Sequence, residues 1–303
     1  MPKAGRNKTI DTTLEEGSAY LARCLTVKEL NDGADPVNRT INGDMREICP
    51  LLNPGCADLI IADPPYNLRK SYDGSVFSKR SAEEYEAYTR DWLATVKPLL
   101  SDRGSIYVCC DWESSLVIGR VMQDMFTVRS RITWQREKGR GAKKNWKNGM
   151  EDIWFATKGD DYTFNLDAVK IRRKVIAPYR SNGEPKDWVE SEQGSYRDTC
   201  PSNFWDDITV PFWSMPENTA HPTQKPEKLL AKLILASSNP GDTVLDPFLG
   251  SGTTSVTAKK LDRHYIGMEL EPRYCVWAEQ RLERAETDCR IQGYDGVFTE
   301  RNF

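Results

Sequence analysis

Apolar residues recur along the chain in two alternating patterns. Short apolar runs, such as residues 58–62 and 104–110, are typical of strands buried in a parallel sheet. The segments between them, such as 81–100 and 114–125, place apolar residues at helical spacing and predict amphipathic helices. This alternation predicts an α/β fold built on one open sheet.

Interruptions of this alternation divide the chain into four parts. Residues 1–37 mix charged and small polar residues and form an N-terminal extension, with one amphipathic helix expected within residues 13–30. Strand and helix signals run over 38–158, give way to an irregular stretch rich in Pro, Gly, Ser and Trp over 159–220, and return over 221–303. We therefore expect one core in two halves with an irregular lobe between them.

Composition narrows the class of protein. The 42 basic and 45 acidic residues give a net charge of −3, so any surface for a polyanion must be local. The eight cysteines are scattered without a CxxC pair, which favours the reduced thiols of a cytoplasmic protein and predicts neither disulfides nor a metal site. No apolar run approaches the roughly 18 residues of a membrane-spanning helix, and the N-terminus lacks a secretory signal, so we expect no membrane partner.

The first cluster with chemical character is Asp63-Pro64-Pro65-Tyr66, directly after the apolar run 58–62. Open α/β sheets present their ligands at the carboxyl ends of strands. Two prolines fix the backbone and remove two N–H donors, which leaves carbonyl acceptors. A carboxylate, carbonyl acceptors and an aromatic ring suit a flat heterocycle that carries an NH2 group, although a structural Pro-Pro turn would have the same sequence.

A glycine turn, DPFLGSGTT, lies between a strand signal and a helix signal at residues 246–254. Its spacing is not the dinucleotide fingerprint GxGxxG and it lacks the lysine of a phosphate-binding loop, so we expect close approach by a ligand without pyrophosphate. Glu269 ends the next strand signal, at a distance that suits a carboxylate accepting the hydroxyls of a ribose. The alternatives are a turn that only packs a strand on a helix and a surface glutamate.

A third cluster, HPTQKP at residues 221–226, precedes an amphipathic helix. The hydroxyl of Thr223 and the ammonium of Lys225 at a helix start suit a carboxylate ligand. His221 taken alone is more often structural.

With these motifs in this order, the sequence resembles the β-type amino-methylating DNA methyltransferases, in which the catalytic motif precedes the cofactor motif. The resemblance runs from about Thr40 to Ala285. It implies an S-adenosylmethionine-dependent methyltransferase with a Rossmann-like sheet, a circularly permuted motif order and an irregular target-recognition insertion at 159–220. It also implies that S-adenosylmethionine is the cofactor.

The resemblance assigns roles to individual residues. The catalytic motif is Asp63, Pro64, Pro65 and Tyr66, with Asp63 shared between the catalytic and the cofactor-binding sets. The other residues implied to bind the cofactor are Asp44 at its adenine side, Glu269 at its ribose, Asp246, Phe248, Gly250, Ser251, Gly252 and Thr253 along its methionine part, and His221, Thr223 and Lys225 at its methionine end.

Two basic clusters suit contacts with phosphates. The first lies in a basic loop, residues 136–149, and the second within residues 170–174; a solvated charged loop is the alternative for either. The resemblance implies that residues between about 138 and 213 contact base edges. The candidate DNA-binding residues are Arg136, Lys138, Arg140, Lys143, Lys144, Trp146, Lys147, Arg172 and Arg173.

The implied function is site-specific methylation of the N6 amino group of adenine in double-stranded DNA, by flipping the base out of the duplex and by direct in-line transfer. Asp63 favours adenine, since a serine at this position more often accompanies cytosine in the family resembled. Methylation of cytosine N4 is the alternative, followed by an RNA methyltransferase or an inactive nucleic-acid-binding relative. The resemblance also allows a homodimer and a cognate restriction endonuclease.

Overall fold

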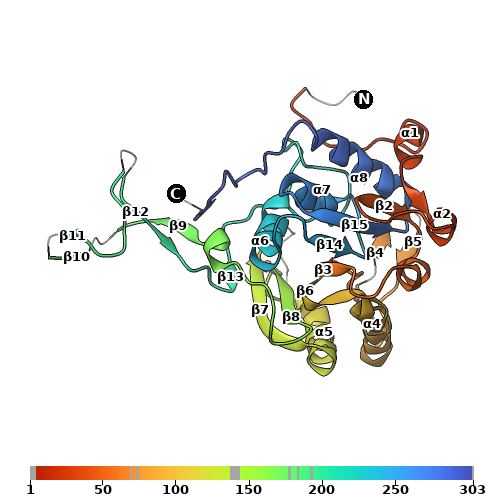
Figure 1. Ribbon diagram of the computed structural model, residues 1–303, viewed down its shortest axis with the longest axis horizontal. Helices are drawn as coiled ribbons and strands as arrows, with labels where there is room; N and C mark the ends of the chain where they lie inside the picture. The colour runs from red at the N-terminus through yellow and green to blue at the C-terminus, as the bar shows by residue number, and fades with distance from the viewer. Residues whose placement is uncertain are drawn as a thin grey trace.

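The computed structural model describes residues 5–68, 70–72, 75–136, 144–176, 179–182, 184–191 and 194–301. Within them, nine strands form one sheet in the order β1-β2-β15-β14-β3-β6-β8-β7-β13 (Figure 1). Neighbouring strands of this sheet are parallel except at β8, which is antiparallel to β6 and β7, so the predicted α/β fold is confirmed. The strands are β1 (Leu25–Thr26), β2 (Arg39–Asn42), β3 (Ala57–Ala62), β6 (Leu100–Cys110), β7 (Thr127–Gln135), β8 (Met150–Thr157), β13 (Phe204–Trp205), β14 (Thr243–Asp246) and β15 (His264–Glu269).

Side chains of the central strands alternate between two apolar cores, one on each face of the sheet. In β3, Ile60 and Ala62 join the core with α3, α4 and α5, whereas Leu59 and Ile61 join the core with α6, α7 and α8. In the described part of the chain, no helix is long and apolar enough to span a membrane. The helices of the two layers are α3 (Met45–Ile48), η1 (Cys49–Leu51), α4 (Ala82–Val96), η2 (Lys97–Leu99) and α5 (Trp112–Met125) on one face, and α6 (Glu227–Ser237), α7 (Thr253–Lys260) and α8 (Pro272–Arg284) on the other.

Strands β3 and β14 join the two halves of the core at the centre of the sheet. They are parallel, with Val244 opposite Leu59, and β15 lies parallel to β14 on its other side. The carboxyl ends of these three strands therefore lie at one edge of the sheet. This topology brings together the motif after β3, the glycine turn after β14 and Glu269 at the end of β15.

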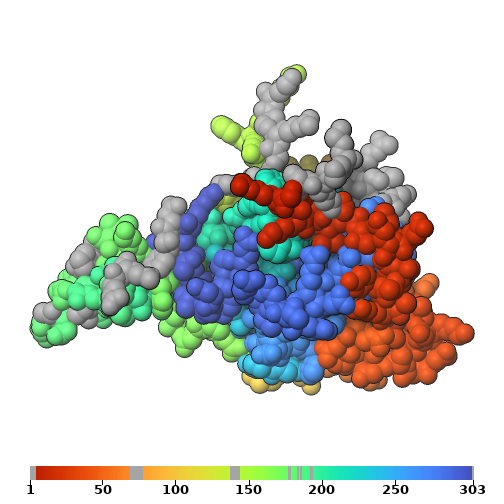
Figure 2. Space-filling view, turned by 90° about the horizontal axis from the view of Figure 1, so that it is seen from above, coloured from red at the N-terminus to blue at the C-terminus, as the bar shows by residue number. Residues whose placement is uncertain are grey.

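A small lobe projects from the core (Figure 1 and Figure 2). Its three-stranded sheet has the order β12-β9-β16, so a strand near the C-terminus pairs with a strand of the irregular stretch. Strand β13 belongs to the same stretch but adds to the edge of the main sheet beside β7. The remaining elements are η3 (Leu166–Val169), β9 (Ile171–Lys174), β10 (Arg180–Ser181), β11 (Glu184–Pro185), β12 (Tyr196–Thr199) and β16 (Phe298–Thr299), and, apart from the lobe, the hairpin of β4 (Lys70–Tyr72) and β5 (Ser75–Phe77).

The N-terminal extension does not form the single helix expected over residues 13–30. Two short helices, α1 (Ser18–Leu21) and α2 (Val27–Asn31), are separated by β1, which pairs with β2 at the edge of the main sheet. The hydroxyl of Thr26 accepts from the Glu29 N–H and the Glu29 carboxylate accepts from the Thr26 N–H, a capping box that starts a new helix. The single-helix prediction is wrong because strand pairing and this cap interrupt the helical periodicity.

The extension also contacts the segment that precedes residue 221. The Lys8 N–H donates to the Trp213 carbonyl at 2.8 Å, and Ile10 forms a β-bridge with Thr219. The Trp277 indole of α8 donates to the Thr12 carbonyl at 2.9 Å. These bonds tie the loop carrying residues 213–220 to α8, next to the carboxyl edge of the sheet.

Candidate active site

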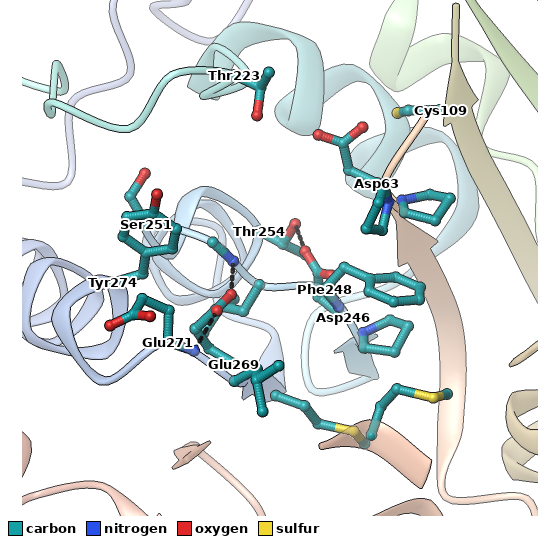
Figure 3. A pocket seen from close by; sticks show the side chains of 18 of the residues that line it. Asp63, Cys109, Thr223, Asp246, Phe248, Ser251, Thr254, Glu269, Glu271 and Tyr274 are labelled. Carbon is teal, nitrogen blue, oxygen red and sulfur yellow. Dashed lines mark hydrogen bonds between the residues drawn. The ribbon is translucent and has the colours of Figure 1, made fainter. Parts of the chain in front are cut away.

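A cavity of about 390 Å³ lies at the carboxyl ends of β3, β14 and β15 (Figure 3). Both halves of the core contribute to its walls. Among the residues predicted to act in catalysis or cofactor binding, Gly252 alone lies outside the lining, behind the turn. Those that line the cavity are Asp44, Asp63, Pro64, Pro65, Tyr66, His221, Thr223, Lys225, Asp246, Phe248, Gly250, Ser251, Thr253 and Glu269.

Asp246 holds the start of the glycine turn. Its Oδ1 accepts from the Phe248 N–H at 2.9 Å and its Oδ2 accepts from the Thr254 hydroxyl at 2.5 Å. Burial raises the pKa of Asp246 to about 7, although these two hydrogen bonds act in the opposite direction. The carboxylate therefore stabilises the turn rather than pointing freely at a ligand.

Two positions in the turn require glycine. Gly250 has φ +56°, and a Cβ there would lie 3.2 Å from His221 Nε2; Gly252 has φ +85°, and its Cβ would lie 2.6 Å from the Cβ of Ala278 in α8. Side chains other than glycine rarely adopt such backbone angles. The turn thus packs tightly on α8 and on the 221–226 segment, and its backbone forms one wall of the cavity.

Glu269 lies in the same wall with both oxygens held by backbone groups (Figure 3). Its Oε2 accepts from the Gly250 N–H at 2.7 Å and its Oε1 accepts from the Glu271 N–H at 2.8 Å. Burial raises the pKa of Glu269 to about 7, against the effect of these hydrogen bonds. Each oxygen keeps a second lone pair, so the carboxylate can still accept from hydroxyl groups in the cavity.

The remaining walls come from residues near positions 44 and 221. Asp44 caps α3, its Oδ1 accepting from the Arg46 N–H at 2.8 Å. The His221 ring lies edge-on to the Tyr274 ring, with 4.5 Å between centroids. Tyr274, which the sequence analysis did not single out, lines the cavity at the start of α8.

Gln224 organises the 221–226 segment. Its Oε1 accepts from both the N–H and the hydroxyl of Thr219 at 2.8 Å, and its amide donates to the Glu217 carbonyl at 2.7 Å. These bonds fold residues 217–224 back on themselves before α6 begins. They direct His221 and Thr223 to one part of the cavity and Lys225 to another.

Lys225, which the resemblance places at the methionine end of the cofactor, bonds to the DPPY motif in this structure. Its ammonium donates to Asp63 Oδ2 at 2.6 Å and to the Tyr66 hydroxyl at 3.0 Å, and it lies 3.3 Å from Glu151 Oε2. Burial lowers the pKa of Lys225, but the Asp63 and Glu151 carboxylates outweigh burial and raise it above its ordinary value. The half-buried Asp63 carboxylate and the buried Glu151 carboxylate attract the ammonium to the DPPY motif.

Tyr66 completes this cluster. Its hydroxyl donates to Asp63 Oδ1 at 2.8 Å and lies 3.2 Å from Glu151 Oε2. Burial, followed by the nearby Asp63 and Glu151 charges, raises the pKa of Tyr66 well above its ordinary range, so the phenol is neutral. The Tyr85 hydroxyl donates to the Pro65 carbonyl at 3.2 Å and supports the motif from below.

Sequence reasoning missed two buried charged residues at this site. Glu151 in β8 joins the DPPY cluster, and Arg281 in α8 donates to the Ser251 carbonyl and the Thr253 hydroxyl from behind the turn. The only sequence signals are an acidic residue at the start of an apolar strand run and an arginine on the apolar side of a helix. Neither identifies a partner, because the partners lie far away in the chain.

The predicted DNA-binding residues fall into three groups. Lys138, Arg140 and Lys143 lie outside the described residues. Lys144, Trp146, Lys147 and Arg173 are exposed, and Trp146 is 92% exposed. Arg136 pairs with Glu151, and Arg172 makes two 2.9 Å bonds to Asp198. Both arginines therefore have partners within the protein.

The part of the chain that the structure describes contains no candidate metal-binding site. No group of three or more His, Cys, Asp and Glu side chains there is arranged to hold a metal ion. The cysteines are free thiols, and Cys109, which lines the cavity, is buried. Burial raises the pKa of the Cys109 thiol well above its ordinary value, which keeps it protonated and poorly nucleophilic.

Comparison with known proteins gives concordant matches. The family model described as DNA methylase, of the N6/N4 type, matches residues 57–280. The DNA adenine methyltransferase YhdJ of Escherichia coli (strain K12) is 36% identical over 256 residues, which cover 81% of this chain and 82% of the relative. The Type II methyltransferase M.HpaI of Haemophilus parainfluenzae is 35% identical over 243 residues, which cover 79% of this chain and 71% of the relative.

Solved structures share the fold. The crystal structure of the M1.HpyAVI-SAM complex matches with a TM-score of 0.55 and 25% identity, over 80% of this chain and 98% of that one. The PvuII DNA methyltransferase, described as cytosine-N4-specific, matches with a TM-score of 0.60 and 17% identity, over 88% of this chain and 95% of that one. At that identity the second match concerns the fold alone.

Proposed function

Since the chain belongs to the DNA methylase family of the N6/N4 type, we propose that it transfers a methyl group from S-adenosylmethionine to the N6 amino group of adenine at a specific site in double-stranded DNA. One observation carries the proposal. Asp63-Pro64-Pro65-Tyr66 faces, across a single cavity, the glycine turn and Glu269. Hydrogen-bond acceptors for an amino group and a cradle for a nucleoside are thereby within one site.

The cavity fits S-adenosylmethionine by size and by chemistry. Small-molecule sites have volumes of about 300–1,000 Å³, and the cavity here measures about 390 Å³. A side chain at Gly250 would fill the space beside His221, so the turn leaves room for close backbone approach. We assign Glu269 to the ribose hydroxyls, Asp44 to the adenine side, and Phe248, Gly250, Ser251, His221 and Thr223 to the methionine portion.

S-adenosylmethionine, when bound, supplies an electrophilic methyl group on a sulfonium sulfur. The residues of the chain act on the target amino group. Asp63 and the Pro64 carbonyl accept its two hydrogens, which favours a pyramidal nitrogen with its lone pair directed at the methyl carbon. The Tyr66 ring stacks on the flipped base, and its neutral hydroxyl, bonded to Asp63, fixes the carboxylate. No covalent enzyme intermediate is required.

DNA contacts are assigned to the exposed basic residues and to the irregular stretch. Lys144, Lys147 and Arg173 are exposed and suit phosphates, and Trp146 suits stacking on an unpaired base. The projecting lobe within residues 159–220 is assigned to target recognition because it reaches away from the core (Figure 1 and Figure 2). Arg136 and Arg172 pair with Glu151 and Asp198, and contact of either with DNA stays a prediction.

We further propose two partners. The first is a restriction endonuclease that recognises the same site, which the name of the relative M.HpaI, a Type II methyltransferase, supports. A second copy of this chain is the other. Protection of DNA from a co-encoded endonuclease and sedimentation of the purified chain test these two partners separately.

The decisive experiment incubates the purified chain with radiolabelled S-adenosylmethionine and unmethylated genomic DNA, then identifies the labelled nucleoside by mass. The proposal predicts label in N6-methyladenine and none with Asp63→Ala, which should still bind the cofactor. Label in N4-methylcytosine would replace adenine by cytosine as the target. No label in DNA, or normal turnover by Asp63→Ala, would overturn the proposal.

A further inference from the structure

Glu151 is a buried carboxylate that the mechanism above leaves without a role. It lies in β8 and is 3% exposed. Its Oε1 pairs with Arg136, whereas its Oε2 lies 3.2 Å from the Tyr66 hydroxyl and 3.3 Å from the Lys225 ammonium. A buried carboxylate is costly unless such partners replace water, so the position of Glu151 beside the DPPY motif suggests a function there.

The geometry shows what Glu151 does to its neighbours. The Lys225 ammonium lies between two carboxylates, 2.6 Å from Asp63 and 3.3 Å from Glu151. The formal charges of the Asp63, Glu151, Lys225 and Arg136 side chains sum to zero. Without the Glu151 charge, Lys225 would be drawn wholly to Asp63, and the Tyr66 hydroxyl would lose one of the two carboxylates that surround it. Glu151 thus determines the positions of the Lys225 ammonium and the Tyr66 hydroxyl relative to Asp63.

Arg136 connects this cluster to the basic loop. It directly follows β7, and its N–H donates to the Gly149 carbonyl at 2.7 Å, which closes the two ends of the loop. Its side chain is 26% exposed. The guanidinium therefore lies between solvent and the buried carboxylate and joins Glu151 to the start of the basic loop through one ion pair.

We infer that Glu151 is a positioning residue for methyl transfer, holding Lys225 and Tyr66 on Asp63, and that its pairing with Arg136 links this arrangement to the basic loop. The inference rests on the proposed function. Misplacing a catalytic group by about 1 Å costs on the order of 100-fold in rate. Loss of the Glu151 charge is expected to have an effect of that size on kcat and little effect on binding.

The test measures kcat and KM for DNA, and the Kd of S-adenosylmethionine by calorimetry, in the full chain and in Glu151→Gln. We expect kcat to fall by about 100-fold, with both binding constants changed by less than about threefold. The double variant Glu151→Gln/Arg136→Met should match Glu151→Gln alone, because both changes break one ion pair. Asp152→Asn is the matched control: Asp152 is equally buried in β8 but bonds to Ser115 and Thr133 instead, so kcat should be retained.

Each result decides between outcomes. Wild-type kcat in folded Glu151→Gln overturns the inference, as does a kcat loss matched by an equal loss of cofactor affinity, which indicates a general collapse of the site. If Glu151→Gln does not fold, Arg136→Met decides: a fall of about tenfold in kcat supports the link, and unchanged kcat overturns it. Absence of DNA methylation by the unaltered chain would instead overturn the proposed function, and the inference with it.

Discussion

Lys225 donates a 2.6 Å hydrogen bond to Asp63, although 162 residues separate the two in the chain. The lysine follows β13 and the 217–224 turn, and the aspartate follows β3, so only the folded sheet brings them together. Because neighbouring carboxylates raise the pKa of Lys225 despite its burial, the ammonium is charged in the folded protein. This places a fixed positive charge beside the acceptor that is proposed to hold the target amino group.

Replacing Lys225 by Met should lower kcat by about 100-fold while changing the Kd of S-adenosylmethionine by less than about threefold. The physical reason is that the ammonium orients Asp63 and Tyr66, not the cofactor. Single-turnover kinetics and calorimetry measure the two quantities. Lys228→Met is the control, since the Lys228 ammonium bonds to Asp207, 3.2 Å away, and should retain kcat. If Lys225→Met instead loses cofactor affinity and retains kcat, Lys225 binds the carboxylate of the cofactor, as the sequence analysis expected.

Cofactor binding should depend on pH through Glu269. Burial raises the pKa of this carboxyl to about 7, and ribose hydroxyls need the ionised form as acceptor. The affinity for S-adenosylmethionine should therefore fall as the pH drops below about 7, by up to about tenfold per pH unit. Calorimetric titrations between about pH 5.5 and 8.5 measure this slope. Glu269→Gln should bind weakly with a flat profile, and a flat profile in the unaltered chain would contradict the assignment.

Folding stability of the ligand-free chain should depend on pH in the opposite direction. Asp246 and Glu269 have pKa values of about 7, above the ordinary 3.8 and 4.5, chiefly because of burial. Their contribution is present in full below the ordinary values and is lost as the pH rises through about 7. Over that range Asp246 lowers the unfolding free energy by up to about 4 kcal/mol and Glu269 by up to about 3 kcal/mol. Urea denaturation of Asp246→Asn/Glu269→Gln should show a weaker pH dependence; an unchanged slope would refute this.

The two glycines of the turn should differ in their tolerance of a side chain. In Gly252→Ala the new Cβ meets the Cβ and Cα of Ala278 at 2.6 and 2.7 Å, and the backbone keeps φ +85°. In Gly250→Ala the nearest atom, at 3.2 Å, belongs to the His221 ring, which can shift. We expect losses of about 2–5 kcal/mol for Gly252→Ala and about 1–2 kcal/mol for Gly250→Ala. Chemical denaturation measures both, and the reverse order would show that the turn relaxes away from α8.

Local sequence information was enough to predict much of this site. The DPPY motif directly follows a strand, and the glycine turn joins a strand to a helix. Both positions are visible in the periodicity of a few residues. Their meeting follows from a general property of parallel sheets, in which carboxyl ends share one edge. The lining of the cavity by Asp44, Glu269 and His221 could be anticipated from the same family order.

Contacts between distant segments could not be predicted in this way. The partners of Lys225 depend on how the 217–224 turn folds around Gln224, and Glu151 reaches the site because β8 lies antiparallel beside β6. The helical periodicity of residues 13–30 was misleading because β1 pairs with β2. In each case the deciding interaction joins elements that no local pattern relates.

Arg281 lies behind the glycine turn and links it to the buried end of α6. One guanidinium nitrogen donates to the Ser251 carbonyl at 2.8 Å and to the Thr253 hydroxyl at 2.9 Å, and the other donates to Glu227 Oε1 at 2.9 Å. The Arg281 and Glu227 side chains are 3% and 4% exposed. Removing the cation leaves the buried Glu227 carboxylate paired with Lys260 alone of these two cations, so Arg281→Met should lower the unfolding free energy by about 3 kcal/mol, the lower end of the cost of breaking a buried pair. The turn loses two donors at the same time.

The second effect separates Arg281 from a merely structural ion pair. Lys260 also contacts Glu227, at 2.7 Å, but its other bond goes to the Arg290 carbonyl, away from the turn. Lys260→Met should therefore cost stability without a matching loss of cofactor affinity, whereas Arg281→Met should weaken S-adenosylmethionine binding by about tenfold, the cost of roughly one hydrogen bond. Calorimetry at a temperature where both variants are folded makes the comparison. If Lys260→Met and Arg281→Met lose equal affinity for S-adenosylmethionine, the direct bonds from Arg281 to the turn contribute nothing to binding. The turn would then depend only on the cations that neutralise Glu227.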